Sequence, residues 1–156
     1  MELSNEEDKK MAIWGIRKLF GKKPEKNELS HQESEKPKTS SDREIEEYTM
    51  AIKLNPGDAV AYYNRGIAYK ALGQPERALA DYTKAIEINP GFAMAYTNRG
   101  NVYTDLGQPE RALSDYTKAL DLNPGDATAY YNRGIAYKAF GQPGRALADY
   151  AKAIKI

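Results

Sequence analysis

Residues Ala59 to Phe92 read AVAYYNRGIAYKALGQPERALADYTKAIEINPGF, and this stretch decides the fold because the chain repeats it. A second version, AMAYTNRGNVYTDLGQPERALSDYTKALDLNPGD, follows 34 residues later, and a third runs from Ala127 to Ile156. Residues 58–88 and 126–156 are identical at 26 of 31 positions. A fixed period of this length is typical of a solenoid, in which each repeat packs only on its neighbours.

Each repeat predicts two α-helices joined by a short turn. Small and aromatic residues recur at spacings of three and four from Ala59 to Tyr69, which is the spacing of one helical face. Gly73 favours the end of this helix, because glycine adopts the left-handed conformation. Pro75 favours the start of the next, because a first helical residue needs no N–H. The second helix is expected to end near Ile88, ahead of the turn sequence NPG.

The linked positions of this pattern closely resemble the tetratricopeptide repeat family. In the first repeat the matching residues are Tyr62, Gly66, Tyr69, Ala78, Tyr82, Ala85 and Pro90. The second repeat matches at Gly100, Tyr103, Ala112, Tyr116, Ala119 and Pro124, and the third at Gly134, Tyr137, Ala146, Tyr150 and Ala153. The resemblance implies an all-α fold, a right-handed α-solenoid of antiparallel helix pairs. It would form residues 42–156, as a half-repeat at 42–57 and repeats at 59–92, 93–126 and 127–156.

One position departs from the family's usual pattern, which more often has leucine there. It holds Arg65, Arg99 and Arg133, and an unpaired guanidinium would be costly to bury. Asp81, Asp115 and Asp149 recur with the same period on the second helix. We therefore predict a structural ladder of arginine and aspartate pairs, within a repeat or between neighbouring repeats. The alternative is that the arginines reach solvent along their aliphatic stems.

The N-terminal part differs in kind from the repeats. Residues 1–23 include the stretch KKMAIWGIRKLFGKK from Lys9, with six basic residues and no acidic one. Candidate contact residues on this short amphipathic helix are Ile13, Trp14, Ile16, Arg17, Lys18, Leu19 and Phe20. Three interpretations stay open: binding to a membrane surface with anionic lipid, docking in a groove of a partner protein, and packing on the chain's own repeats.

Residues 24–41 are rich in Glu, Lys, Ser and Gln and have the composition of a disordered linker. His31 lies in this linker, and no second histidine exists to form a metal or catalytic site with it. The linker predicts that the N-terminal segment is a tethered module. At the other end, the last helix would expose Leu147, Tyr150 and Ile154, which predicts a fragment of a longer array or homo-oligomer formation.

Composition and motifs exclude several classes of function. The net charge of +1 gives no general attraction to nucleic acid, and the chain has no cysteine for disulfides or thiol chemistry. No apolar run approaches the ~18 residues of a membrane span, and the acidic N-terminus is a poor secretion signal, so we expect a cytoplasmic protein. The sequence lacks GxxxxGK[ST] and HExxH motifs. We therefore expect no enzyme activity, no cofactor and no metal.

The resemblance to tetratricopeptide repeats implies that the first helix of each repeat lines a concave groove. The matching positions are Val60, Tyr63, Asn64, Ile67 and Lys70, then Met94, Thr97, Asn98, Asn101 and Thr104, then Thr128, Tyr131, Asn132, Ile135 and Lys138. Asn64, Asn98 and Asn132 form a periodic row of amides, each with a donor and an acceptor for the backbone of an extended peptide. This row resembles the asparagine ladder of O-linked N-acetylglucosamine transferases. The alternative is that each amide bonds within the array.

A second family binding mode, the carboxylate clamp for chaperone C-termini, is disfavoured. The clamp needs Lys, Asn and Arg on successive first helices, but Tyr63, Ile67, Thr128 and Asn132 occupy four of those places and only Asn98 matches. We therefore predict an adaptor that holds an extended peptide segment of a partner protein in the groove. The alternative function is a self-assembling scaffold, attached peripherally to a membrane through the N-terminal segment.

Overall fold

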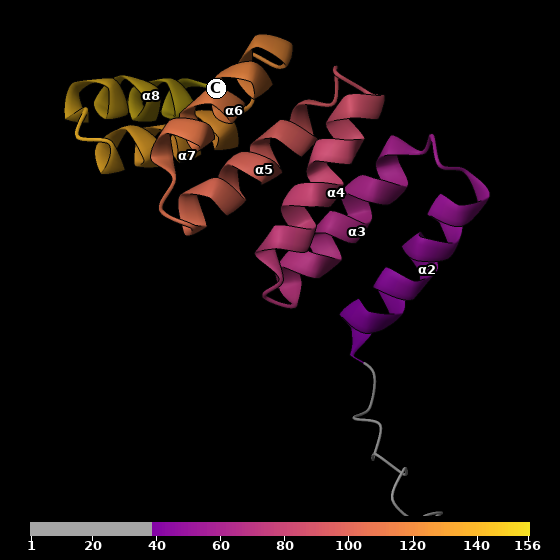
Figure 1. The fold of residues 1–156 in the computed structure, drawn as a ribbon. Helices are drawn as coiled ribbons and strands as arrows, with labels where there is room; N and C mark the ends of the chain where they lie inside the picture. Colours follow the sequence, from indigo (N-terminus) through magenta and orange to yellow (C-terminus); the bar gives the residue numbers. More distant parts are fainter. Residues whose placement is uncertain (1–38) are drawn as a thin grey trace, which may run out of the picture. The chain divides into compact units, whose positions relative to one another are not determined.

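The computed structural model describes residues 39–156, which form seven α-helices and no strand (Figure 1). The helices follow one another as α2 (Ser40–Leu54), α3 (Ala59–Ala71), α4 (Pro75–Ile88), α5 (Ala93–Asp105), α6 (Pro109–Leu122), α7 (Ala127–Ala139) and α8 (Pro143–Lys155). Each of the three repeats is a helix pair, α3 with α4, α5 with α6 and α7 with α8. An all-α solenoid of antiparallel helix pairs, as the sequence predicts, is thus confirmed.

The turn inside each repeat uses the predicted glycine and proline. Gly73, Gly107 and Gly141 have φ angles of 68°, 68° and 75°, in the left-handed region that glycine adopts without strain. Two residues later, a proline occupies the first turn of α4, α6 and α8. The same three-residue turn therefore reverses the chain direction in every repeat.

The start of α2 differs from the predicted boundary of the linker. The helix begins at Ser40, two residues before the expected start at Asp42, because Thr39 forms a capping box. The Thr39 hydroxyl accepts a hydrogen bond from the Asp42 N–H at 3.1 Å, and the Asp42 carboxylate accepts one from the Thr39 N–H at 2.9 Å. Ser40 and Ser41 are therefore helical and do not belong to a linker.

The core of each helix pair is set by a glycine that faces a tyrosine. A Cβ atom added at Gly66 would lie 2.7 Å from Cε1 of Tyr82, and one at Gly100 would lie 2.8 Å from Cε1 of Tyr116. Tyr82 and Tyr116 are each only 1% exposed. The absence of a side chain on the first helix therefore lets the ring of the second helix pack directly on its backbone.

The first helices of the repeats lie on the inner side of the stack. In the part of the chain that the structure describes, α3 contacts α5 and α5 contacts α7, whereas α4 does not contact α6 and α6 does not contact α8. Consecutive second helices are therefore farther apart than consecutive first helices. The stack curves toward α3, α5 and α7, and we call the surface of these three helices the inner surface.

Several predictions concern residues 1–38, which lie outside the described residues. They are the amphipathic segment with Ile13, Trp14, Ile16, Arg17, Lys18 and Phe20, and the linker with His31. Between Thr39 and Ile156, no helix combines the length and the apolar content that a membrane crossing requires.

Candidate functional site

The structure pairs every arginine of the predicted ladder with the aspartate of its own repeat. Arg99 donates from Nε and Nη2 to the two carboxylate oxygens of Asp115, both at 2.8 Å. Its Nη1 also donates to Thr83 of the preceding repeat at 3.1 Å. The same contacts join Arg65 to Asp81 and Thr49, and Arg133 to Asp149 and Thr117. Each arginine thus links three helices.

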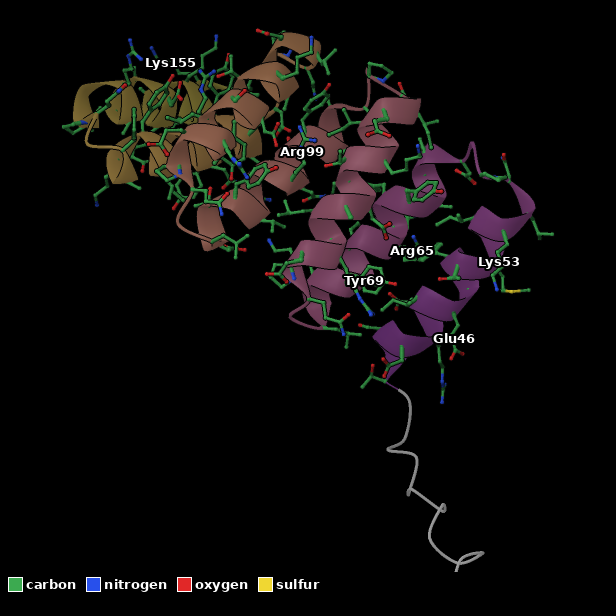
Figure 2. The ribbon with its side chains drawn as sticks, viewed as in Figure 1. Glu46, Lys53, Arg65, Tyr69, Arg99 and Lys155 are labelled. Carbon is green, nitrogen blue, oxygen red and sulfur yellow. The ribbon has the colours of Figure 1, made fainter. Side chains whose placement is uncertain are left out.

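Burial and charge show that these arginines serve the array itself. The Arg99 side chain is 17% exposed and that of Asp115 7% exposed. The hydrogen bonds that Arg99 donates to Asp115 raise the pKa of the Arg99 guanidinium above its usual range, against the opposing effect of burial. The guanidinium carbon also lies 5.7 Å from the centre of the Tyr96 ring. Arg65 and Tyr69 occupy neighbouring turns of α3 (Figure 2), with the guanidinium carbon 5.8 Å from the ring centre.

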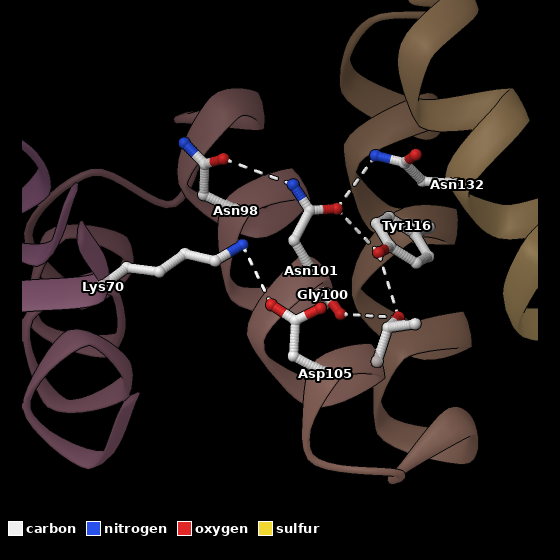
Figure 3. A network of polar contacts seen from close by, with 8 residues as sticks. Lys70, Asn98, Gly100, Asn101, Asp105, Tyr116 and Asn132 are labelled. Atoms are coloured by element: carbon white, nitrogen blue, oxygen red, sulfur yellow. Dashed lines mark hydrogen bonds and ion pairs between the residues drawn. The ribbon is translucent and has the colours of Figure 1, made fainter. Parts of the chain in front are cut away.

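The inner surface carries a hydrogen-bonded network of amides and tyrosines (Figure 3). Asn98 donates to the hydroxyl of Tyr63 at 2.7 Å and accepts from Asn101 at 3.4 Å. The carbonyl oxygen of Asn101 accepts from the hydroxyl of Tyr116 at 2.7 Å and from Asn132 at 2.9 Å. Asn101 therefore lies at the centre of a network that spans all three repeats.

The network uses only part of the hydrogen-bonding capacity of the three amides in the predicted row. One N–H and the carbonyl oxygen of Asn132 make no hydrogen bond with another described residue, and Asn64 makes none with its side chain. Asn98 and Asn132 follow the alternative interpretation in part, because each donates one bond within the array. The row is therefore not a uniform ladder, although each amide is only partly buried and keeps a free donor.

An open pocket lies beside this network. Its volume is about 350 Å³, and it is lined by Lys70, Asn101, Thr104, Asp105, Tyr116, Asn132 and Ile135. Lys70 and Asp105 form an ion pair of 3.1 Å across α3 and α5, and their side chains are 38% and 63% exposed. Because these charges have opposite sign, the pocket presents amide and hydroxyl groups with no net charge.

Tyr116 is one of the residues that line the pocket, and its hydroxyl is neutral. Burial raises the pKa of Tyr116 to about 12, although its hydrogen bond with Thr104 acts in the opposite direction. The two hydroxyl oxygens are 3.1 Å apart, and Thr104 also donates to the carbonyl oxygen of Gly100 at 3.0 Å. Tyr116 therefore remains a hydrogen-bond donor at physiological pH.

The other predicted groove residues differ in how much surface they offer. Ile67, Tyr131 and Ile135 are exposed, at 41%, 55% and 38%, and so is Lys138. Tyr63 is half-buried and packs on Phe92, with ring centres 4.8 Å apart. Thr97 is only 8% exposed, and its hydroxyl donates to Ala93 of its own helix at 3.3 Å. The inner surface therefore has apolar groups in the first and third repeats, and the middle repeat is polar apart from Met94, which is 56% exposed near the start of α5.

Asp105 and the Tyr116 hydroxyl take part in this site but were not among the predicted groove residues. The sequence holds a signal for Asp105, since the middle repeat departs from its neighbours in α5. It has Thr97, Asn101, Thr104 and Asp105 where the third repeat has Tyr131, Ile135, Lys138 and Ala139. Tyr116 fits the repeat pattern as a core residue, so only its contacts reveal the second role. Within residues 39–156, no three His, Cys, Asp or Glu side chains are grouped to hold a metal ion.

Comparisons with known proteins place these features in context. Models described as tetratricopeptide repeat match residues 59–92, 81–114 and 127–156, and one described as TPR repeat matches residues 100–141. A comparison with curated protein sequences found no match.

Three solved structures illustrate the likeness. The crystal structure of MamA is 31% identical, with a TM-score of 0.68, over 71% of this chain and 65% of that chain. YrrB, described as a TPR protein with an unusual peptide-binding site, is 32% identical, with a TM-score of 0.67, over 71% and 57%. The second TPR of Spaghetti (RPAP3), bound to the HSP90 peptide SRMEEVD, is 28% identical, with a TM-score of 0.61, over 62% and 89%. The chain thus spans less than two thirds of the MamA and YrrB chains.

Proposed function

The chain belongs to the tetratricopeptide repeat family, and we propose that it binds an extended segment of a partner protein along the inner surface of α3, α5 and α7. Proteins of this family are generally interaction modules without catalytic activity. The observation that carries the proposal is the pocket beside Asn101 and Asn132, which offers unused amide donors and acceptors on an open surface.

The spacing of the repeats suits an extended chain. Packed helices lie about 8–10 Å apart, and an extended polypeptide advances about 3.3 Å per residue. A bound segment would therefore place about three residues on each repeat. Its central backbone groups would bond the amides of α5 and α7, while its apolar side chains would contact Ile67 and Ile135 on either side.

Two relatives support peptide binding in general but not one particular peptide. YrrB is described with a peptide-binding site, and the Spaghetti domain holds an acidic chaperone peptide. Only Asn98 of this chain matches the clamp for such acidic C-termini. We therefore propose a partner segment with a polar, uncharged centre, because Lys70 and Asp105 cancel each other at the pocket.

The experiment is a selection from a displayed library of linear peptides, with the chain and two variants as bait. One variant changes Asn64, Asn98 and Asn132 to Ala. The matched control changes Lys84, Lys118 and Lys152 to Ala, at three exposed positions of the second helices. We expect enriched peptides to bind the chain and the lysine control but to bind the asparagine variant at least about tenfold more weakly. Equal binding by both variants, each folded by circular dichroism, would refute the proposal.

A self-assembling scaffold is the second candidate function, and exposed apolar residues on α8 favour it. Leu147 and Ile154 are 69% and 85% exposed. Light scattering over a range of protein concentrations tests it, since a scaffold would form oligomers as the concentration rises. The cytoplasmic location and the membrane contact of residues 1–23 stay predictions from the sequence.

A further inference from the structure

The pocket beside Asn101 contains several polar groups whose hydrogen bonds are already made within the chain. The carbonyl oxygen of Asn101 accepts from Tyr116 and from Asn132, which uses both of its lone pairs. The hydroxyl of Thr104 donates to the carbonyl oxygen of Gly100 at 3.0 Å and lies 3.1 Å from the hydroxyl of Tyr116. These groups hold the network together and have little capacity left for a ligand.

Lys70 and Asp105 are the charged groups of the pocket, and both have hydrogen-bonding capacity to spare. The ammonium and the carboxylate lie 3.1 Å apart, and the side chains are 38% and 63% exposed (Figure 3). Among residues 39–156, no other side chain forms a hydrogen bond or an ion pair with either of them. An ammonium has three donors and a carboxylate has two acceptor oxygens. The pair therefore offers unused donors and an unused acceptor next to each other.

This charged pair joins α3 to α5 and has no equivalent between α5 and α7. The residues 34 positions after Lys70 and Asp105 are Thr104 and Ala139, and neither carries a charge. A peptide segment that crosses the inner surface would thus meet such a pair at one junction only. The pair can therefore select a single residue of the segment, which the periodic amides cannot do.

The chemistry of the pair decides which group it binds best. A carboxylate only accepts hydrogen bonds and is repelled by Asp105, whereas an ammonium only donates them and is repelled by Lys70. A side-chain carboxamide is neutral and carries a donor and an acceptor on two atoms, one for each charge. A hydroxyl also donates and accepts, but through a single oxygen. The pair therefore favours a carboxamide, which binds without separating the two charges.

The remaining lining favours glutamine over asparagine. Ile135 of α7 lines the pocket and is 38% exposed. Glutamine has one methylene group more than asparagine, so it buries more apolar surface on this side chain. The pocket volume of about 350 Å³ is at the low end of the range for ligand pockets, about 300–1,000 Å³. This volume suits one side chain of a peptide better than a larger element.

We propose that this pocket binds the side-chain carboxamide of a glutamine in the partner segment, and that Lys70 and Asp105 select it over charged residues. This glutamine site rests on the peptide binding proposed for the inner surface. The ammonium of Lys70 donates to the carboxamide oxygen, the carboxamide N–H donates to Asp105, and the methylene groups contact Ile135. The unused N–H of Asn132 stays available to the peptide backbone.

The test repeats the peptide selection with the chain and with variants that each remove one charge. Peptides enriched by the parent chain should share one position with glutamine. Lys70→Met leaves the carboxylate of Asp105 unpaired, so this position should change to lysine or arginine. Asp105→Asn leaves the ammonium of Lys70 unpaired, so it should change to glutamate or aspartate. Lys84→Met is the matched control, because it breaks an exposed ion pair of 3.0 Å with Glu87 on α4, and it should keep glutamine.

Fluorescence anisotropy then measures the affinity of one enriched peptide and of three derivatives. The derivatives replace the glutamine by Glu, Lys or Met, and Met keeps a similar length without a hydrogen-bond donor. Each replacement should weaken binding to the parent chain at least about fivefold. Asp105→Asn should instead bind the Glu peptide more tightly than the Gln peptide, and Lys70→Met should prefer the Lys peptide.

The outcomes separate this proposal from the one on which it rests. Peptides that need Asn64, Asn98 and Asn132 but bind equally well with Gln, Glu or Met would overturn the glutamine site and leave peptide binding on the inner surface intact. A preference for glutamine that neither charge variant changes, with both variants folded by circular dichroism, would overturn the role of Lys70 and Asp105. The absence of any enriched peptide for the parent chain would refute both proposals.

Discussion

At the scale of single residues, the arginines of the repeats have a structural role because each guanidinium is paired with an aspartate of its own repeat. The family pattern has an apolar residue at this place, and a lone guanidinium there would lose its hydration without compensation. Asp115 accepts two hydrogen bonds of 2.8 Å from Arg99, and Thr83 accepts a third. The charge is therefore satisfied inside the array, and the arginine binds neighbouring repeats together.

Removal of the aspartate from one of these pairs should destabilise the folded chain. Asp115→Ala leaves the guanidinium of Arg99 largely buried and without its carboxylate, so we expect a loss of about 2–4 kcal/mol in the free energy of unfolding. Asp121→Ala, at an exposed position of the same helix, is the control and should change it by less than about 0.5 kcal/mol. Urea unfolding measures both, and equal midpoints for the two variants would show that the bridge contributes nothing.

Tyr116 gives a prediction for alkaline pH. Its pKa is raised by burial to about 12 in the folded chain, whereas an unfolded tyrosine ionises near pH 10. As the pH rises from about 10 to 12, the unfolded chain loses this proton first, so the stability that is present below pH 10 decreases.

Tyr116→Phe tests this linkage. At pH 7 the variant should be less stable by about 1 kcal/mol, because the hydrogen bond to Asn101 is lost. Between pH 9 and pH 11 it should lose less further stability than the parent chain, as measured by urea unfolding at each pH. Tyr131→Phe, which removes an exposed hydroxyl, is the control. A variant whose stability falls as steeply as that of the parent would contradict the linkage.

Among the helices, the distance within a pair is set by the glycine that faces a tyrosine ring. Gly100→Ala would place Cβ 2.8 Å from Cε1 and 3.0 Å from Cδ1 of Tyr116, so one of the two groups must move. We expect a net loss of about 1–3 kcal/mol in unfolding free energy, even though alanine favours the helix by up to about 1 kcal/mol.

Gly144→Ala is the matched control, because nothing lies within 4 Å of a Cβ at that helical position. It should leave stability unchanged or increase it by up to about 1 kcal/mol. Thermal unfolding of both variants separates helix propensity from packing. If Gly100→Ala were as stable as Gly144→Ala, the close approach of α5 and α6 would not depend on this glycine.

Most of the helix boundaries could be predicted from the sequence, because glycine and proline act locally. Gly73 and Pro75 end one helix and start the next through their own backbone preferences. The start of α2 could not be predicted as well, since the capping box of Thr39 and Asp42 lies in a stretch with the composition of a linker. The capping box starts the helix at Ser40, although the composition of residues 24–41 is that of a linker.

The polar network was predictable only in part. The repeat pattern places Asn64, Asn98 and Asn132 at equivalent positions, but the contacts of each amide depend on its neighbours in other repeats. Asn98 meets Tyr63 and Asn132 meets Asn101, whereas Asn64 has no such partner among the described residues. The pairing follows from side-chain geometry across α3, α5 and α7, which a one-dimensional pattern does not contain.

For the array as a whole, the middle repeat breaks the periodicity where the inner surface becomes polar. Thr104 and Asp105 replace the lysine and alanine of the neighbouring repeats, and Asp105 pairs with Lys70 at 3.1 Å. The array thus combines a regular stack, which the arginine bridges hold together, with one irregular site. This irregular site gives the inner surface a centre that differs from its two ends.

The most direct test of partner binding on the inner surface is a nuclear magnetic resonance titration with a library-selected peptide. We predict that the side-chain amide signals of Asn98, Asn101 and Asn132 shift together with backbone signals of α3, α5 and α7, while the signals from the exposed faces of α4 and α6 stay unchanged. Shifts confined to α4, α6 or α8, with the three amide signals unmoved, would contradict it.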